Sequence, residues 1–266
     1  MNIFLHEFKA NMRSVITWSI ALTLLILLFM SLFSGFAVEA ELLNQTLEKF
    51  PKEFLMAFGM DGIDLSTVLG FFSFAILFCQ LCVSIQGANY GFSLVSIEER
   101  EMTADFLLSK PVGRAKIMTS KLLAALASLA ITSLVVWISS YVLINFYRDG
   151  RPYDNKTLIL LLLTIAFLQL FFLTVGMLIS LLPRKIRSVT PYSMGVVFGL
   201  YVLNAFGDML GEDILSYITP FRHFDANNII RNRGFDPLVL ISVFLIVISI
   251  AGSYLLYTKR DIHTAV

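Results

Sequence analysis

Six long runs without a charged residue divide the chain, and they restrict its fold more than any other feature. Each run has at least the roughly 20 residues that a helix needs to cross about 30 Å of hydrocarbon. Lipid cannot satisfy open backbone groups, so spanning segments of this length are expected to be helical. The runs are Ser14–Val38, Leu65–Ile97, Leu122–Tyr147, Thr157–Pro183, Ser188–Gly207 and Pro237–Thr258.

The composition agrees with a bilayer as the main solvent. Only 15% of the residues are charged, against about 25% in a typical soluble domain. The net charge of +1 gives no indication of a nucleic-acid partner. We therefore predict an all-α membrane protein, with one transmembrane domain over residues 1–266. Its six transmembrane helices are expected at about 14–38, 65–95, 118–146, 157–182, 188–208 and 237–258.

The residues before the first run have an amphipathic pattern. Apolar residues recur near helical spacing from Ile3 to Met12, with Lys9 and other polar residues between them. This pattern predicts an interfacial N-terminal helix that lies on the membrane surface. The uncharged stretch that follows is much longer than a signal-peptide core and is preceded by Glu7, so we expect no cleavage.

The distribution of Lys and Arg predicts the orientation. Six spans place both termini, the 98–121 segment and the 184–187 loop on one side. That side holds twelve of the 20 Lys and Arg residues, mostly close to helix ends. Because positive residues near helix ends favour the cytoplasmic side, both termini are expected in the cytoplasm.

A charged segment, Glu98–Lys121, separates the second and third runs. Ser96 and Glu99 fit a capping box, and the acidic residues up to Glu101 fall in a first helical turn, where the helix dipole favours anions. Pro111 is expected to end the helix. These signals predict a helix of about twelve residues that begins at Ser96 and lies parallel to the membrane.

The same segment carries a longer pattern, E-E-x-x-M-T-x-D-x-L-L-S-x-P-V-x-R, from Glu98 to Arg114. It resembles the cytoplasmic loop between the second and third spans of ABC-2 type transporter permeases, where glycine usually takes the place of Met102. Lys121 fits a later basic position of that loop. Two further features fit the family: Pro220-Phe221 in the last outer segment and a Tyr-x-Lys-Arg-Asp ending at 257–261.

The resemblance implies an export permease of the bacterial plasma membrane that lacks its own motor. Two such subunits, alike or different, pair with two ATP-binding subunits, which hold ATP and Mg²⁺. This chain is then not an enzyme and binds no cofactor itself, and it contains no G-x-x-x-x-G-K-[ST] motif. Residues 98–110 would form the coupling helix that docks on the ATPase. The implied interface residues are Glu98, Glu99, Met102, Thr103, Asp105, Phe106, Leu107, Leu108, Pro111 and Arg114.

The fifth run contains a second candidate site. Gly195 and Gly199 form a G-x-x-x-G, with Phe198, Tyr201 and Asn204 nearby. This spacing allows close helix packing, and in the permease interpretation these residues mark the dimer face or the translocation path between two subunits. Packing within one subunit is the alternative. The sequence does not indicate the cargo.

Rival functions fit less well. An ion-coupled secondary transporter usually has ionisable residues at mid-membrane, and the six runs contain none. Their polar residues, Gln80, Gln86, Asn89, Gln169 and Asn204, more often join helices than bind substrate. A purely structural membrane subunit also stays open. An intramembrane protease of the Glu-Glu-x-x-x-Arg kind would need arginine at Thr103. Cys79 and Cys82 lie in an apolar run and the three histidines are scattered, so we predict no metal site.

Overall fold

The computed structural model describes residues 3–38, 46, 49–51, 55, 63–101, 113–183, 186, 188–210 and 213–259. This part of the chain is helical and contains no strand. Six of its helices are long and apolar enough to cross a membrane: α1, α4, α6, α7, α8 and α12. The all-α prediction and the six long apolar helices are therefore confirmed. The helices are α1 (Ile3–Val38), α4 (Val68–Glu101), α6 (Arg114–Tyr147), α7 (Asn155–Ser180), α8 (Val189–Leu210), α9 (Asp213–Ile218), α10 (Pro220–His223), α11 (Ala226–Asn232) and α12 (Val239–Lys259).

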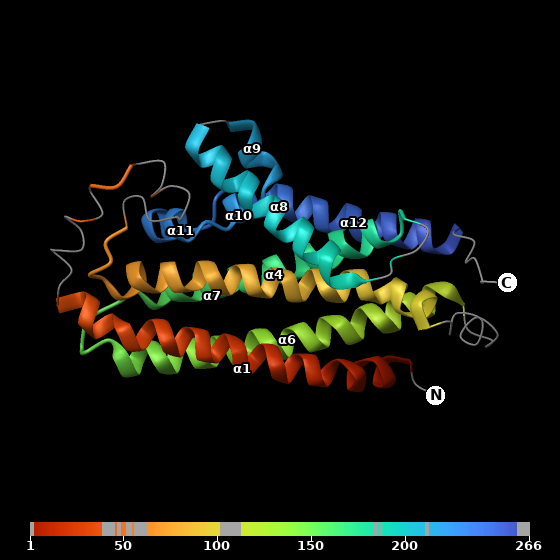
Figure 1. Ribbon diagram of the computed structural model, residues 1–266, viewed down its shortest axis with the longest axis horizontal. Coiled ribbons are helices and arrows are strands. Elements are labelled where there is room, and N and C mark those ends of the chain that lie inside the picture. Colours follow the sequence, from red (N-terminus) through yellow and green to blue (C-terminus); the bar gives the residue numbers. More distant parts are fainter. Residues whose placement is uncertain are drawn as a thin grey trace.

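Four long helices form the body of the protein. α1, α4, α6 and α7 run side by side along the long axis, and α8 and α12 lie against one face of this layer (Figure 1). α4 and α7 are the central helices, since both contribute to all three apolar clusters, α4 for example through Ile76, Phe92 and Leu94. α8 is the least buried of the six. The most extensive packing joins α4 to α7 and α1 to α6.

The N-terminal segment differs from its prediction. Residues 3–13 do not form a separate helix on the membrane surface but are continuous with the first span, in one helix from Ile3 to Val38. At ~1.5 Å per residue this helix is about 54 Å long, well beyond the ~30 Å hydrocarbon layer. Its first turns pack along α6, and Glu7 has an ionic partner there, so nothing forces a break before residue 14.

The second span also continues further than predicted. A helix start at Ser96 is wrong, because α4 is one helix from Val68 to Glu101. The hydroxyl of Ser96 donates to the carbonyl oxygen of Phe92 at 2.6 Å, and its side chain is buried. This bond to the preceding turn is the alternative that a serine has to capping the next one. The local capping signal is therefore overridden by burial inside a continuing helix.

Short helices fill the segment between α8 and α12. The sequence is too apolar there for a free loop, and α9, α10 and α11 pack onto the long helices. Phe221, after the proline that starts α10, is buried with its ring 5.6 Å from those of Phe172 and Tyr201. The carbonyl oxygen of Phe224 accepts a bond from Gln80 of α4 at 3.1 Å. The Pro-Phe element thus anchors the segment to the core.

Asp225 caps the first turn of α11 and provides a test of this anchoring. Its carboxylate accepts from the backbone N–H of Asn228 at 2.7 Å. Burial raises the pKa of the Asp225 carboxyl, although the Asn228 bond and the charge of Arg222 oppose this. Because this pKa is raised, the folded protein holds the carboxyl proton more tightly than the unfolded chain does. The resulting stabilisation of the folded protein is complete below the unfolded pKa of ~3.9, and it is lost as the pH rises through the pKa of the folded state.

Asp225→Asn should therefore raise the melting temperature at pH 7, because asparagine keeps the cap and removes a half-buried charge. Asp225→Ala should lower stability by about 1 kcal/mol, because the cap is lost. Thermal unfolding of the purified protein at pH 5 and pH 8 measures both effects. Equal destabilisation by asparagine and alanine would contradict the assignment of a half-buried capping charge.

Candidate functional site

The predicted coupling segment lies mostly outside the described residues. Met102, Thr103, Asp105, Phe106, Leu107, Leu108 and Pro111 fall there, so the coupling helix stays a prediction. Its two flanks are described: Glu98 and Glu99 belong to the last turns of α4, and Arg114 begins α6. These flanks lie at the same end of the bundle as the start of α1 and the end of α12 (Figure 1).

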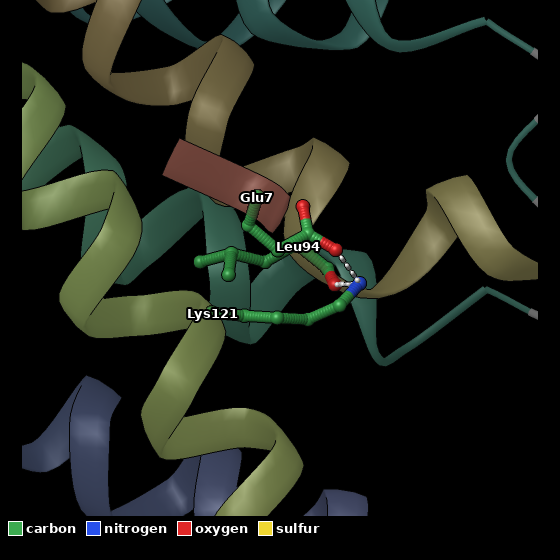
Figure 2. A network of polar contacts seen from close by, with 3 residues as sticks. All are labelled: Glu7, Leu94 and Lys121. Atoms are coloured by element: carbon green, nitrogen blue, oxygen red, sulfur yellow. Dashed lines mark hydrogen bonds and ion pairs between the residues drawn. The ribbon is translucent and has the colours of Figure 1, made fainter. Parts of the chain in front are cut away.

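Lys121 joins three helices at this end (Figure 2). Its Nζ donates to the carbonyl oxygen of Leu94 in α4 at 2.9 Å and lies 3.6 Å from Oε1 of Glu7 in α1. Lys121 is only 3% exposed, although it carries a charge that is costly to bury without partners. The structure thus brings α1, the end of α4 and the start of α6 together around one ammonium group.

In the sequence, Lys121 stands out only as a basic position of the loop motif, and no local pattern connects it to Glu7. One feature of the sequence does indicate that Lys121 is buried. Lys121 follows Ile117 and Met118 by four and three residues, so it falls on the buried stripe of α6 rather than on its exposed face. A lysine in such a stripe indicates a partner on a neighbouring helix. The sequence could not name that partner, because Glu7 and Leu94 are distant along the chain.

Arg114, an implied interface residue, contacts the end of α12. Its Nη1 donates to the carbonyl oxygen of Thr258 at 3.4 Å. One turn further along α6, the hydroxyls of Thr119 and Tyr254 are hydrogen-bonded at 2.7 Å. The start of α6 is therefore tied to the last turns of α12 as well as to α1 and α4.

Buried carboxamides connect the helices in the interior. Gln86 of α4 donates to Thr132 of α6 at 3.0 Å and accepts from Gln169 of α7 at 3.0 Å. Gln169 in turn accepts from Ser133 of α6 at 2.6 Å. A second contact runs from Gln80 to Thr164 at 2.9 Å. The interpretation of these glutamines as links between helices is confirmed.

Asn89, the two cysteines and His223 do not take part in this carboxamide network. The carboxamide oxygen of Asn89 is buried without a hydrogen-bond partner among the described residues. Cys79 is buried and Cys82 is half-buried. Within the described ranges, no three His, Cys, Asp or Glu side chains gather as a metal site would need. His223 of α10 is buried and hydrogen-bonded to Ser242 at 2.6 Å.

The five candidate residues on α8 divide into two groups. Gly195 and Gly199 face open space, since a Cβ on either would meet no described atom within 4 Å, and Phe198 between them is 42% exposed. Tyr201 instead packs edge-on against Phe221, and Asn204 accepts a bond from Thr219 at 3.1 Å. The two glycines therefore pack against none of the residues that the structure describes in this subunit.

A different G-x-x-x-G, which was not predicted, makes the close packing inside the subunit. Gly87 and Gly91 of α4 lie against the backbone of α7. A Cβ on Gly87 would stand 2.5 Å from the carbonyl oxygen of Gln169, and one on Gly91 would overlap the carbonyl oxygen of Leu173. Gly176 of α7 faces back toward α4. The spacing was visible in the second run, but nothing local distinguishes it from the pair in α8.

These features define a multi-pass membrane protein. The end of α4 and the start of α6, which flank the charged 98–121 segment, lie together with the start of α1 and the end of α12. Comparison with known families then identifies its class: the model of the ABC-2 family transporter proteins matches residues 1–262. The chain therefore belongs to the ABC-2 transporter family, as the resemblance of the 98–114 segment indicated. No curated relative matches the chain significantly.

Proposed function

We propose that this chain is the permease subunit of an ATP-binding-cassette exporter in the bacterial plasma membrane, with both termini in the cytoplasm. The observation that carries the proposal is the family match over nearly the whole chain. Members of this family form the membrane component of a transporter and work with a separate ATP-binding subunit. ATP and Mg²⁺ bind that partner, and this chain supplies the path through the membrane.

Coupling to the ATPase is assigned to residues 98–110. Two features support this: the sequence motif, and the convergence of the end of α4 with the start of α6 around Lys121. A segment held between these two ends can pass a displacement of the ATPase to two membrane-crossing helices. Arg114 adds the end of α12 to the same region.

The exposed face of α8 is assigned to the contact between two permease subunits. Gly195 and Gly199 are open to approach by another helix, and Phe198 projects beside them. Small residues at this spacing permit close approach of helix backbones in lipid. The translocation path would then run between the two subunits, beside α8.

Co-purification tests the proposal. The tagged chain, co-expressed with the ATP-binding-cassette protein of a neighbouring reading frame, is expected to retain that ATPase through size-exclusion chromatography, with two copies of each chain. ATP hydrolysis in nanodiscs should require both proteins to reach its full rate. Transport by the chain alone, driven by an ion gradient in proteoliposomes, would instead identify a secondary transporter.

A further inference from the structure

Two cations of α6 and the turn after it hold the same pair of helices at opposite ends of the bundle. At one end Lys121 contacts Glu7 of α1 and Leu94 of α4 (Figure 2). At the other end Arg151 donates to the carbonyl oxygen of Ser66, just before α4, at 2.9 Å. Its guanidinium also lies 5.4 Å from the ring centre of Phe33 in α1.

The turn after α6 explains how Arg151 reaches back. Asp149 and Gly150 both have positive φ angles, of 49° and 74°. The N–H of Arg151 then bonds to the carbonyl oxygen of Arg148 at 2.9 Å. This tight left-handed turn, which glycine adopts without strain, directs Arg151 toward α1 and the start of α4 rather than into solvent.

The distances between the two contacts match in all three helices. Glu7 to Phe33 in α1 rises about 39 Å, and Lys121 to the end of α6 at Tyr147 rises the same ~39 Å. α4 covers an equal rise from its first residue to Leu94. This length exceeds the ~30 Å of hydrocarbon, so it is sufficient for the two contacts to lie at the two boundaries of the membrane.

We propose that Lys121 and Arg151 are positioning residues that clamp α1, α4 and α6 at the two membrane boundaries, so that the three helices move as one rigid body. An apolar side chain of similar length could fill the site of Lys121 without the cost of burying a charge. The charge instead fixes the geometry of its partners. That the body is driven through residues 98–110 rests on the proposed function, whereas the clamp itself does not.

Distances between spin labels in the purified full-length chain in nanodiscs test the clamp. Labels on cysteines at Ala10 and Ala115 report the α1–α6 distance at the inner end, and labels at Gly35 and Val142 report it at the outer end. All four positions are exposed, and the native cysteines are first replaced by alanine. Pulsed electron paramagnetic resonance gives the distribution of each distance.

Lys121→Met is expected to widen the inner distribution roughly twofold and to leave the outer one unchanged, because a helix end can open locally. Arg151→Met is expected to widen the outer distribution roughly twofold and to leave the inner one unchanged. Lys116→Met and Lys156→Met remove exposed charges near the same ends and should change neither. Unchanged widths in both clamp variants, or equal widening in the controls, would overturn the proposal.

Charge reversal separates the ion pair from simple packing. The double variant Glu7→Lys/Lys121→Glu keeps an ion pair between α1 and α6 but loses the donation to Leu94. The inner α1–α6 distribution should therefore be narrower than in Lys121→Met, whereas a packing role for Lys121 would leave it as wide. Glu7→Gln tests the same pair if the lysine variant does not fold. If the wild-type chain captures no ATPase, the proposed function fails, while these distances still decide the clamp.

Discussion

Gly91→Ala should strongly destabilise the protein, because the added methyl group has no room between α4 and α7. The added Cβ would overlap the carbonyl oxygen of Leu173 and stand 2.8 Å from the backbone nitrogen of Met177. Both atoms belong to the backbone of α7, so no side chain can move aside. Overpacking of this kind costs about 1–3 kcal/mol, and a backbone clash belongs at or above the upper end.

Gly35→Ala is the matched control, because Gly35 also lies in a membrane helix, α1, but has no described atom within 4 Å of the new methyl group. Melting temperature and monodispersity in detergent measure both variants. Gly35→Ala should behave like the wild type, and Gly91→Ala should melt earlier or aggregate. Equal stability of the two would mean that α4 and α7 do not pack as described.

Replacement of Thr103, Leu107 and Leu108 by aspartate should abolish association with the ATPase without unfolding the chain. In the proposed complex these side chains dock in a groove of the partner. A carboxylate in such a groove costs several kcal/mol unless it is paired. When this contact surface is lost, the ATPase should no longer stay bound to the tagged chain during size-exclusion chromatography.

Ala115→Asp provides the control for this triple variant. It adds an acidic charge at an exposed position in the first turn of α6, close to the segment but outside the motif. An acid near a helix N-terminus is tolerated. The ATPase should co-purify with this variant and not with the triple variant, both with wild-type melting temperatures. Full retention by the triple variant would exclude the 98–110 segment as the docking site.

The number and place of the long helices could be predicted because lipid imposes its own rule. A run such as Thr157–Pro183 has no alternative to a helix of nearly that extent, and α7 covers Asn155–Ser180. Boundaries at the membrane surface follow no such rule. There the outcome depends on tertiary contacts, such as the burial of Ser96 and the pairing of Glu7, which no local pattern contains.

The candidate sites show the same division. Two G-x-x-x-G pairs occur in apolar runs, and only the fold determines that Gly87 and Gly91 pack inside while Gly195 and Gly199 face outward. The buried role of Lys121 likewise requires two helices that are far away in sequence. The pattern at 98–114 indicated the ABC-2 family, and the family match over residues 1–262 confirms that identification. The coupling role of the segment stays a prediction.

Site-specific photo-crosslinking tests the central claim, docking of the ATPase through residues 98–110, most directly. A photoreactive amino acid is placed at Leu107 in the full-length chain, and at Ile138, an exposed residue on the lipid-facing side of α6, as the comparison. After irradiation of membranes that contain both proteins, Leu107 should form an adduct with the ATPase and Ile138 should form none. A complex that co-purifies but gives no ATPase adduct at Leu107 would contradict the account.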